Sequence, residues 1–204
     1  MKRTAEEAAA TRARVLEAAI LVFADKGWKD ATFHAIGARA GVTRGAVHHH
    51  FGDKKLLLEE AIGAGWRRHA APALEELVRP EHGPGRRLTG FLTRYLRLLA
   101  ENESFRALAV ASVLVAPQVL DVGEGVKEKI EETDQWAALI LPLLDTPGLR
   151  QGLRAEDALF TVMAMLHGVT VTAATAPHEL PAAEAAAGIA RAVVAGLLPG
   201  QEEG

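Results

Sequence analysis

Residues 32–55, TFHAIGARAGVTRGAVHHHFGDKK, constrain the fold of this 204-residue chain more than any other segment. Ile36 and Ala40 lie four residues apart, with Phe33 one turn earlier, which is the spacing of one apolar helix face. Gly41 follows directly and predicts the end of that helix, because glycine is common just past a helix C-terminus.

A second short helix is predicted immediately after this glycine. Thr43 is a favourable N-cap residue, because its hydroxyl can accept a hydrogen bond from an unpaired backbone amide of the first helical turn. Val47 and Phe51, again four residues apart, give this helix its apolar face. A helix, a glycine turn and a helix form the helix-turn-helix pattern, whose second helix enters the major groove of DNA.

The other face of the second helix has the chemistry that this pattern requires. Arg44, Gly45, His48 and His49 fall outside the apolar stripe, so we expect them to face outward. Arg44 lies in the first turn, where its guanidinium can bond guanine bidentately, a contact worth roughly 1–3 kcal/mol of discrimination. Glycine costs a helix roughly 1 kcal/mol relative to alanine, so Gly45 beside the small Ala46 indicates close approach to another molecule.

The start of the next predicted helix is suited to contact with an anion. Asp53 is a candidate N-cap, and Lys54 and Lys55 place two positive charges at the positive end of the helix dipole. A phosphate would offset this repulsion by accepting hydrogen bonds from the backbone amides and the ammonium groups.

The run GVTRGAVHHHFGDKKLL and the preceding TRARVLEAAILVFADKGW resemble the DNA-binding domain of the TetR family of transcriptional repressors, over residues 9–69. The string VTRGA, followed by HF, is similar to AcrR-type repressors of multidrug efflux pumps in particular. His48 stands where the family usually carries tyrosine. In relatives that residue contacts phosphate or base, and histidine can donate a similar bond. The resemblance implies a DNA-binding domain over residues 9–69 and an effector-binding and dimerisation domain over residues 70–204.

The residues that we expect to contact DNA divide by role. Arg44 and His49 are expected to read base edges, and Gly45 and Ala46 to let the backbone come close. The remaining four are expected to hold phosphates and fix the register on the duplex: Thr32, Thr43, His48 and Lys54.

Charge is distributed unevenly along the chain. Residues 1–55 contain 10 Lys+Arg and 6 Asp+Glu, a net charge of +4, whereas the whole chain has a net charge of −3. The polarity favours an N-terminal face that meets phosphate. Many soluble proteins have an asymmetry of this size, so it supports the interpretation only beside the helix-turn-helix pattern.

Length and composition limit the class of protein further. A chain of 204 residues can bury a core large enough to fold unaided. Cysteine is absent, which excludes a disulfide framework and a thiolate metal site. The charged, alanine-rich N-terminus is not typical of a secretory signal, and we expect no segment with the ~18–20 apolar residues that span a bilayer. The predicted location is the cytoplasm, without membrane contact.

Beyond Lys55 the apolar spacing is helical throughout and strand signals are nearly absent. The predicted fold is therefore all-α, with an N-terminal three-helix helix-turn-helix domain and a C-terminal helical ligand-binding and dimerisation domain. Further helices are predicted over residues 54–79 with a kink at Pro72, then about 88–101, 104–115, 127–144, 155–175 and 181–198.

The last two predicted helices are rich in small and apolar residues. The final one has a wide apolar stripe: Ala183, Ala186, Ala187, Ala190, Val193, Val194 and Leu197. Such a stripe, if exposed, promotes aggregation, so these helices pack inside the monomer or pair with a second copy. The resemblance implies a homodimer through the last two helices, with two recognition helices about 34–36 Å apart on a palindromic operator.

The resemblance also implies a small-molecule effector held between the helices of the C-terminal domain. Aromatic and methionine side chains suit lipophilic ligands, although ordinary core packing is their commoner role. A core or interface position is likewise the commoner role for a histidine in an uncharged helix. The candidate ligand-binding residues are Trp66, Phe91, Tyr95, Phe105, Trp136, Met163 and His167.

Other chemistry does not fit this sequence. The consecutive histidines 48–50 project about 100° apart on a helix and cannot converge on one metal ion. The HExxH, GxSxG and P-loop motifs are absent. We expect no enzyme activity, no cofactor and no metal. The predicted function is a DNA-binding repressor released from its operator by a small lipophilic ligand; the alternative is a DNA-binding regulator with no small-molecule effector, either constitutive or controlled by a protein.

Overall fold

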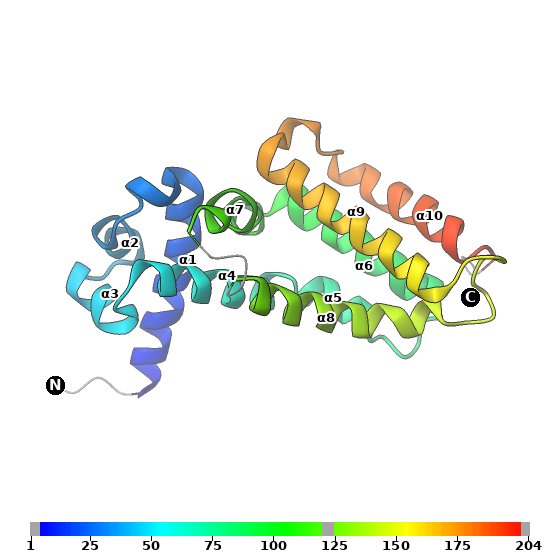
Figure 1. Ribbon diagram of the computed structural model, residues 1–204, viewed down its shortest axis with the longest axis horizontal. Helices are drawn as coiled ribbons and strands as arrows, with labels where there is room; N and C mark the ends of the chain where they lie inside the picture. The colour runs from blue at the N-terminus through cyan, green and yellow to red at the C-terminus, as the bar shows by residue number, and fades with distance from the viewer. Residues whose placement is uncertain (1–4, 120–124, 201–204) are drawn as a thin grey trace. The chain divides into compact units, whose positions relative to one another are not determined.

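The computed structural model describes residues 5–119 and 125–200, with side chains described outside residues 125–134. Within these residues the chain is helical and has no β-strand, which confirms the all-α prediction (Figure 1). The chain divides into two compact units. The first unit contains residues 1–69 and 103–128, and the second unit contains residues 70–102 and 129–204.

The first unit is built around the long N-terminal helix α1 (Ala5–Asp30), which packs against α2, α4 and α7. Val15, Ala19 and Phe23 of α1 are fully buried and lie four residues apart, as expected for a helix with one face in the core. The other elements of the unit are α2 (Phe33–Ala40), α3 (Arg44–Phe51), α4 (Lys54–His69), α7 (Glu103–Val110), a π-helical turn (Ala111–Val115) and a 3₁₀ turn (Ala116–Gln118).

Polar contacts and one glycine join α1, α4 and α7. Nε2 of His69 in α4 lies 3.0 Å from Oε2 of Glu17 in α1, and Ser104 of α7 donates a hydrogen bond to the same carboxylate. Burial acts to raise the pKa of Glu17, but the hydrogen bonds from Ser104 and His69 outweigh it, so the pKa is lowered. Gly65 allows α4 to approach closely, because a Cβ atom there would lie 2.7 Å from Cδ1 of Ile20.

The second unit is organised around α6 (Pro84–Glu101), which packs against α5 (Ala71–Leu77) and α10 (Ala186–Leu197) and contacts α9 (Ala155–Thr175). Most of α8 (Gly125–Leu144) belongs to the same unit. The buried residues of α6 follow helical spacing and form the core: Leu88, Phe91, Leu92, Tyr95, Leu96 and Leu99.

An aromatic cluster with one buried hydroxyl pair lies in this core. Trp136 of α8 is edge-on to Phe91, with ring centroids 6.1 Å apart, and edge-on to Tyr95 at 5.8 Å. The Tyr95 hydroxyl lies 2.6 Å from Oγ1 of Thr170, which itself donates to the Leu166 carbonyl at 2.7 Å. Since a threonine hydroxyl has one proton, Tyr95 is the donor in this pair. Burial raises the pKa of Tyr95 far above its ordinary value.

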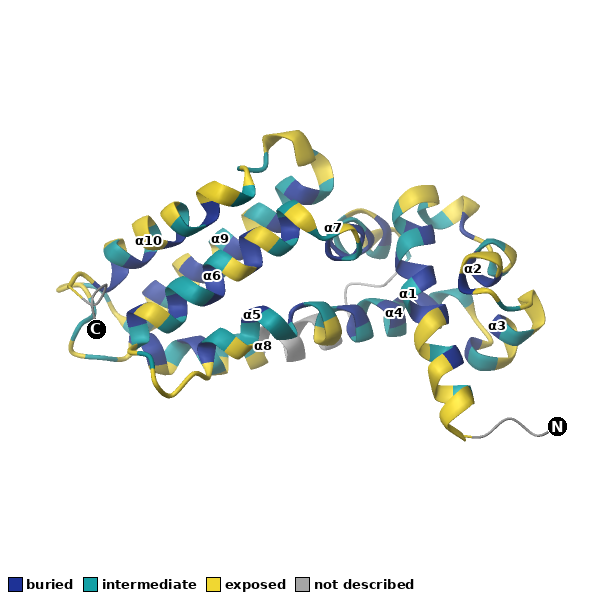
Figure 2. Ribbon diagram, turned by 180° about the vertical axis from the view of Figure 1, so that it is seen from behind, coloured by how far each residue is buried: buried dark blue, intermediate teal, exposed yellow. Residues whose placement is uncertain are grey.

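Helices α9 and α10 both keep exposed faces (Figure 2). On α9, Phe160 is 73% exposed, and Ala164, His167 and Gly168 continue the exposed side at helical spacing. By length and composition α9 could cross a membrane, with 28% of its most apolar window buried, so the prediction that no segment reaches this length was wrong. A single helix of this kind is weak support for a membrane span, because apolar core helices of soluble proteins meet the same criterion.

The apolar stripe predicted on the last helix packs inside the monomer. Ala186, Ala190, Val194 and Leu197 are buried, and α10 packs against α6 within the second unit. Of the two alternatives that the sequence left open, monomer packing therefore holds for this stripe.

Several predicted helix boundaries agree with the structure and two do not. The helix predicted over residues 155–175 is α9 at both ends. The helix predicted over residues 54–79 is two helices separated at Ala70, because Pro72 occupies the first turn of α5. The last helix begins at Ala186 rather than at residue 181, after a 3₁₀ turn (Ala183–Ala185).

Candidate nucleic-acid interface

Two threonine caps and one glycine shape the segment from α2 to α3. Oγ1 of Thr32 accepts from the Ala35 amide at 3.1 Å, and Oγ1 of Thr43 accepts from the Ala46 amide at 3.2 Å, so each helix begins with a side-chain cap. Gly41 ends α2 in the left-handed conformation with φ 69°, which glycine adopts without steric penalty. The predicted N-cap at Thr43 and the predicted break at Gly41 are confirmed.

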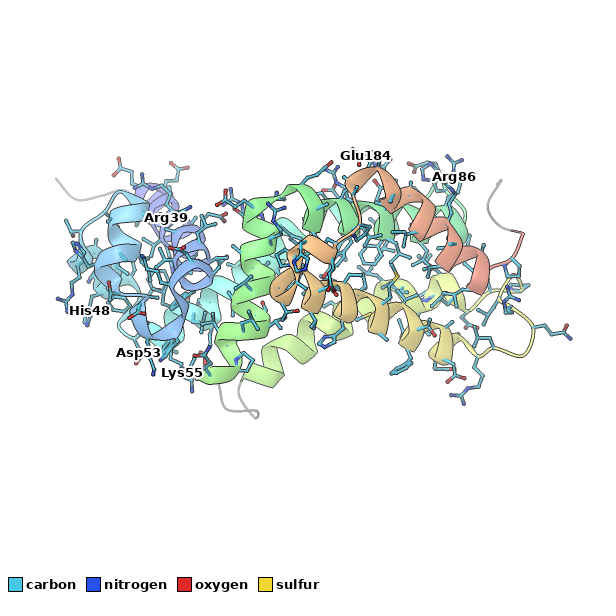
Figure 3. The ribbon with its side chains drawn as sticks, turned by 90° about the horizontal axis from the view of Figure 1, so that it is seen from above. Arg39, His48, Asp53, Lys55, Arg86 and Glu184 are labelled. Carbon is cyan, nitrogen blue, oxygen red and sulfur yellow. The ribbon has the colours of Figure 1, made fainter. Side chains whose placement is uncertain are left out.

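This turn leaves α3 with one buried and one exposed face. Val47 and Phe51 are buried, and Arg44, His48 and His49 are exposed, which confirms the predicted orientation of these side chains. Figure 3 labels His48, whose side chain projects from the outer side of this unit. The face therefore presents one guanidinium and two imidazole groups to solvent.

Within the part of the chain that the structure describes, the hydroxyl protons of the two threonine caps and the imidazole of His48 make no hydrogen bond. A threonine hydroxyl that accepts a bond as a helix cap keeps its proton, so Thr32 and Thr43 can each still donate to an anion. The His48 ring is edge-on to Phe33, with ring centroids 5.8 Å apart, which limits the directions in which the imidazole can point.

Gly45 lies on the exposed face of α3 without a packing reason for being glycine. The nearest neighbour of a Cβ atom built at this position is Oγ1 of Thr43 at 3.9 Å, and its φ is in the ordinary range. The chain would therefore accommodate alanine here, and alanine is the better helix former. The missing methyl group leaves the backbone of α3 accessible from outside.

A cleft of about 530 Å³ brings together three of the predicted DNA-contacting residues: Thr32, Arg44 and Lys54. The starts of α2, α3 and α4 meet around it. The other lining residues are Ala31, Phe33, His34, Gly52 and Asp53. His34 is exposed and was not among the predicted residues, because the helix-turn-helix pattern points to the second helix and its caps. Its position two residues after the Thr32 cap, in the first turn of α2, is the signal that could have identified it.

Lys54 makes contacts within the protein that the sequence did not predict. Its ammonium donates to the carbonyls of Trp28 at 2.6 Å and Ala31 at 3.0 Å, and lies 4.1 Å from the centroid of the Trp28 ring. Asp53, beside it, accepts from the Leu56 amide at 3.3 Å, which confirms Asp53 as the cap of α4.

The candidate ligand-binding residues fall in both units. In the first unit Trp66 and Phe105 are edge-on, with ring centroids 5.3 Å apart, and Nε1 of Trp66 donates to Oγ of Ser112 at 3.1 Å. The other five lie in the second unit: Phe91, Tyr95 and Trp136 in the aromatic cluster, half-buried Met163 and exposed His167.

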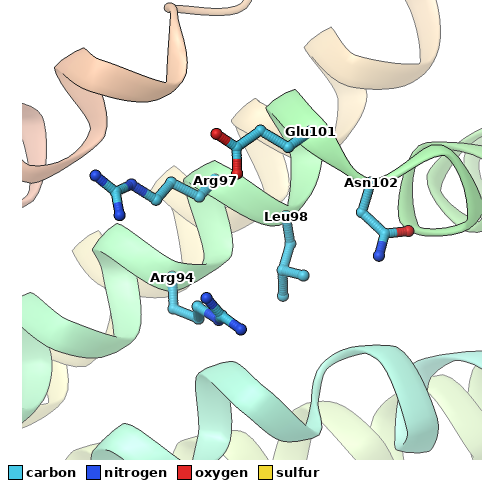
Figure 4. Close-up of a pocket in the computed structure, with 5 residues that line it drawn as sticks. All are labelled: Arg94, Arg97, Leu98, Glu101 and Asn102. Carbon is cyan, nitrogen blue, oxygen red and sulfur yellow. The ribbon is translucent and has the colours of Figure 1, made fainter.

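The second unit also has an open pocket of about 240 Å³ along α6 (Figure 4). It is lined by Arg94, Arg97, Leu98, Glu101 and Asn102, and by none of the candidate ligand-binding residues. Its charged lining differs from the aromatic lining that the sequence predicted for a lipophilic ligand. Among the residues whose side chains are described, no group of three or more His, Asp or Glu residues is arranged to hold a metal ion.

Comparison with known proteins identifies the region that contains this interface. Residues 15–61 match the model of the family described as bacterial regulatory proteins, tetR family. The HTH-type transcriptional regulator SrpR of Pseudomonas putida is 44% identical over 68 residues, which are 33% of this chain and 31% of that protein. This N-terminal region is similar to the DNA-binding region of TetR-family regulators.

The match to one further relative extends beyond the helix-turn-helix. The probable acrEF/envCD operon repressor of Escherichia coli strain K12 is 35% identical over 113 residues, which are 52% of this chain and 49% of that protein. The chain therefore spans about a third to a half of the length of the curated relatives that it matches.

Solved structures share the fold over nearly the whole chain. NalD, the secondary repressor of the MexAB-OprM multidrug efflux pump in Pseudomonas aeruginosa, matches with a TM-score of 0.75 and 22% identity, over 96% of this chain and 99% of that chain. The SmeT–triclosan complex matches with a TM-score of 0.73 and 24% identity, over 94% and 93%. At these identities the likeness shows the fold.

Proposed function

We propose that this protein is a homodimeric, sequence-specific DNA-binding repressor that leaves its operator when a small lipophilic ligand binds. The observation that carries DNA binding is the exposed glycine of α3. Alanine at position 45 would fit and would stabilise the helix more than glycine does. The presence of glycine instead points to a second molecule that approaches the backbone there. Arg44 and His49, exposed on the same helix, supply the groups to read that molecule.

In this proposal the side chains of α3 contact base edges in the major groove. Arg44 donates two parallel hydrogen bonds to a guanine from the first turn of the helix. His49 adds a donor or an acceptor one turn later. Gly45 and Ala46 allow the helix to lie close to the bases.

Phosphate contacts come from the ends of the same helices. The hydroxyls of Thr32 and Thr43 donate to phosphate oxygens while they cap α2 and α3, and His48 donates in the place of the usual tyrosine. His34, in the cleft that holds Thr32 and Arg44, joins this group.

The exposed side of α9 supports a homodimer. Phe160, Ala164 and Gly168 form an apolar strip with small side chains, which a second copy would cover. Because the stripe of α10 packs on α6, α9 contributes the larger part of this proposed interface, and α10 contributes its exposed Gly188 and Ala192. A two-fold dimer would place two copies of α3 on a palindromic operator.

The effector is proposed from the candidate ligand-binding residues and from relatives. NalD is the secondary repressor of a multidrug efflux pump, and the structure of SmeT is that of its complex with triclosan. Aromatic and methionine side chains in the helical core suit a lipophilic ligand. A regulator with no small-molecule effector is a second candidate, favoured by the edge-on contacts that already engage Trp136 with Phe91 and Tyr95. Either protein would act on DNA in the cytoplasm.

The test of DNA binding is a titration of the pure protein against the duplex immediately upstream of its own gene. A scrambled duplex of equal length is the control, and salt is held near physiological concentration. We expect the upstream duplex to be preferred by roughly a thousandfold or more. Equal, weak binding to both duplexes would contradict a local, sequence-specific regulator.

The same complex tests the effector. Lipophilic compounds are added to the preformed protein–DNA complex, and release is followed by fluorescence anisotropy of the labelled duplex. Release by such a compound, with protein stability unchanged or raised in its presence, supports the ligand-released repressor. A complex that no compound dissociates supports the regulator without a small-molecule effector.

A further inference from the structure

The side chain of Lys54 extends away from its own helix to the end of another. Lys54 is the first residue of α4, where the helix dipole disfavours a positive charge. Its ammonium instead reaches the carbonyls of Trp28 and Ala31, at 2.6 Å and 3.0 Å. Trp28 lies just beyond Gly27, where the backbone of α1 is not helical, so its carbonyl stands outside the regular hydrogen bonding of that helix.

The backbone at this point explains why two carbonyls are available. Gly27 leaves the helical conformation with φ 69°, so the last residues of α1 diverge from its regular path. The Trp28 ring stacks on Phe23, with ring centroids 5.9 Å apart and planes 10° apart, and Phe23 is fully buried in the core. The ammonium lies 4.1 Å from the centroid of that fixed ring, which adds a cation–π contact to the two hydrogen bonds.

These contacts connect three helix ends. Trp28 belongs to the end of α1, Ala31 directly precedes the Thr32 cap of α2, and Lys54 begins α4. Ala31 borders the cleft but is fully buried, so its carbonyl needs a protein donor. Two of the three ammonium protons are used in this way. The repulsion that suggested a phosphate partner for Lys54 is therefore already offset inside the protein.

We propose that Lys54 is a positioning residue, which fixes the start of α2 against α1 and α4 and so sets the register of the helix-turn-helix on DNA. This inference rests on the proposed function. It replaces the phosphate contact predicted for Lys54 with a contact that acts through Thr32 and α2. The two roles give different salt dependence, because each phosphate contact releases counterions and a positioning contact does not.

The test uses the full-length protein with Lys54→Met, which keeps an unbranched side chain over Trp28 but removes the charge. Lys54→Arg keeps the charge and is the conservative variant, and Lys55→Met removes the neighbouring lysine as a matched control. Dissociation constants are measured for the operator and the scrambled duplex over a range of salt concentrations. Amide hydrogen exchange of the protein without DNA is measured over residues 28–36.

We expect Lys54→Met to weaken operator binding by roughly tenfold or more, with binding to the scrambled duplex and the salt slope unchanged. Amide exchange at Ala35 and Ile36 should accelerate, and Lys54→Arg should restore part of both losses. Lys55→Met should leave amide exchange unchanged.

Three results would overturn the proposal. Equal losses on both duplexes with a salt slope lower by roughly one would establish a phosphate contact. Lower thermal stability with unchanged dissociation constants would establish a role in stability alone. Unchanged amide exchange would show that the contact holds nothing in place. If the wild-type protein fails to prefer its operator, the proposed function fails, and amide exchange still decides whether Lys54 fixes the start of α2.

Discussion

At the scale of single residues, Tyr95 shows how a hydroxyl is accommodated in the apolar core of the second unit. The Tyr95 hydroxyl donates a hydrogen bond to Thr170, and the Thr170 hydroxyl donates to the Leu166 carbonyl, so the three groups form a chain of hydrogen bonds. Tyr95 is 1% exposed, and water cannot replace a lost partner. Removing the acceptor of this pair should therefore cost more stability than removing the donor. A buried donor that loses its acceptor costs more free energy than an acceptor that loses one of its bonds.

We predict that Tyr95→Phe lowers the free energy of unfolding by about 1 kcal/mol and that Thr170→Val lowers it by about 1–3 kcal/mol. Tyr95→Phe removes the donor and leaves Thr170 bonded to Leu166, whereas Thr170→Val removes the hydroxyl that accepts the proton of the buried tyrosine. Urea titrations of both variants measure the difference. A larger loss for Tyr95→Phe would contradict the assigned direction of the hydrogen bond.

The pKa of Tyr95, which burial raises, predicts how stability depends on alkaline pH. The unfolded chain releases this proton near the ordinary pKa of about 10, while the folded chain retains it. The contribution to stability is thus complete below pH of about 10 and is lost as pH rises above it. Tyr95→Phe should show a shallower alkaline decline. Tyr95 is the single tyrosine of the chain, so tyrosinate absorbance reports its ionisation directly.

Arg44 is the residue that we expect to discriminate bases. Arg44→Ala should weaken operator binding by roughly 1–3 kcal/mol and relax discrimination at one base position, because a bidentate contact to guanine is lost. Arg86→Ala removes an equal charge from an exposed position of α6, outside the unit that contains the helix-turn-helix, and should change neither operator binding nor base discrimination. A saturation-mutated operator that gives the same base preferences with Arg44→Ala would rule out this role.

How far single residues could be predicted depended on how far away their partners lie. Thr43 and Gly41 were identified because a cap and a helix stop involve partners within a few residues. Lys54 bonds to backbone carbonyls 26 and 23 residues earlier, and no sequence spacing relates these positions. The helix dipole predicts that the positive charge of Lys54 needs an acceptor, whereas only the fold shows which groups accept from it.

At the scale of elements, α3 contains a residue, Gly45, that makes the helix less stable than alanine would. Alanine at position 45 would fit, since the nearest atom to its Cβ is 3.9 Å away. Gly45→Ala should therefore raise the free energy of unfolding by roughly 0.5–1 kcal/mol, as measured by thermal and urea unfolding. Operator binding should fall by roughly tenfold or more, because the methyl group holds α3 away from the bases.

The two measurements for Gly45→Ala are informative together. Greater stability with unchanged operator binding would mean that DNA does not approach this backbone closely. The exposed Gly45 would then no longer support the proposed function. Binding of Gly45→Ala to the scrambled duplex serves as the control, because non-specific contacts to phosphate do not require α3 deep in the groove.

In two other elements the apolar spacing predicted a continuous α-helix, and the structure shows a break or a wider turn. Apolar spacing continues from residue 54 to residue 77, but the backbone breaks at Ala70, because Pro72 fits the first turn of a new helix. The predicted helix over residues 104–115 is α-helical to Val110 and π-helical from Ala111. One wider turn leaves the apolar pattern nearly unchanged, so the sequence carries little sign of it.

At the scale of the whole molecule, the compact units do not follow the order of the chain. Residues 103–128 return to the first unit after α5 and α6 have formed part of the second. The functional division at residue 69 was predicted from the end of the family resemblance, which has no means of detecting a later segment that rejoins the first unit. That α7 contacts α1 is a property of the tertiary packing alone.

The exposed strip of α9 leads to the prediction at this scale. Ala164 is exposed between Phe160 and Gly168, and a charged side chain there would be buried without a partner in the proposed dimer. Ala164→Glu should convert the dimer to monomer at micromolar concentration, as measured by sedimentation equilibrium. Ala138→Glu, an equal change at an exposed position of α8, is the matched control and should remain dimeric.

Operator binding by the same pair of variants connects the interface to function. Monomeric Ala164→Glu should lose most of its preference for the operator over the scrambled duplex, because one α3 contacts half of a palindrome. Circular dichroism at equal concentration checks that Ala164→Glu keeps its helical content. A folded Ala164→Glu protein that remains dimeric would exclude this face of α9 as the interface. A folded monomer that keeps its full preference for the operator would show that a single α3 is enough for specific binding.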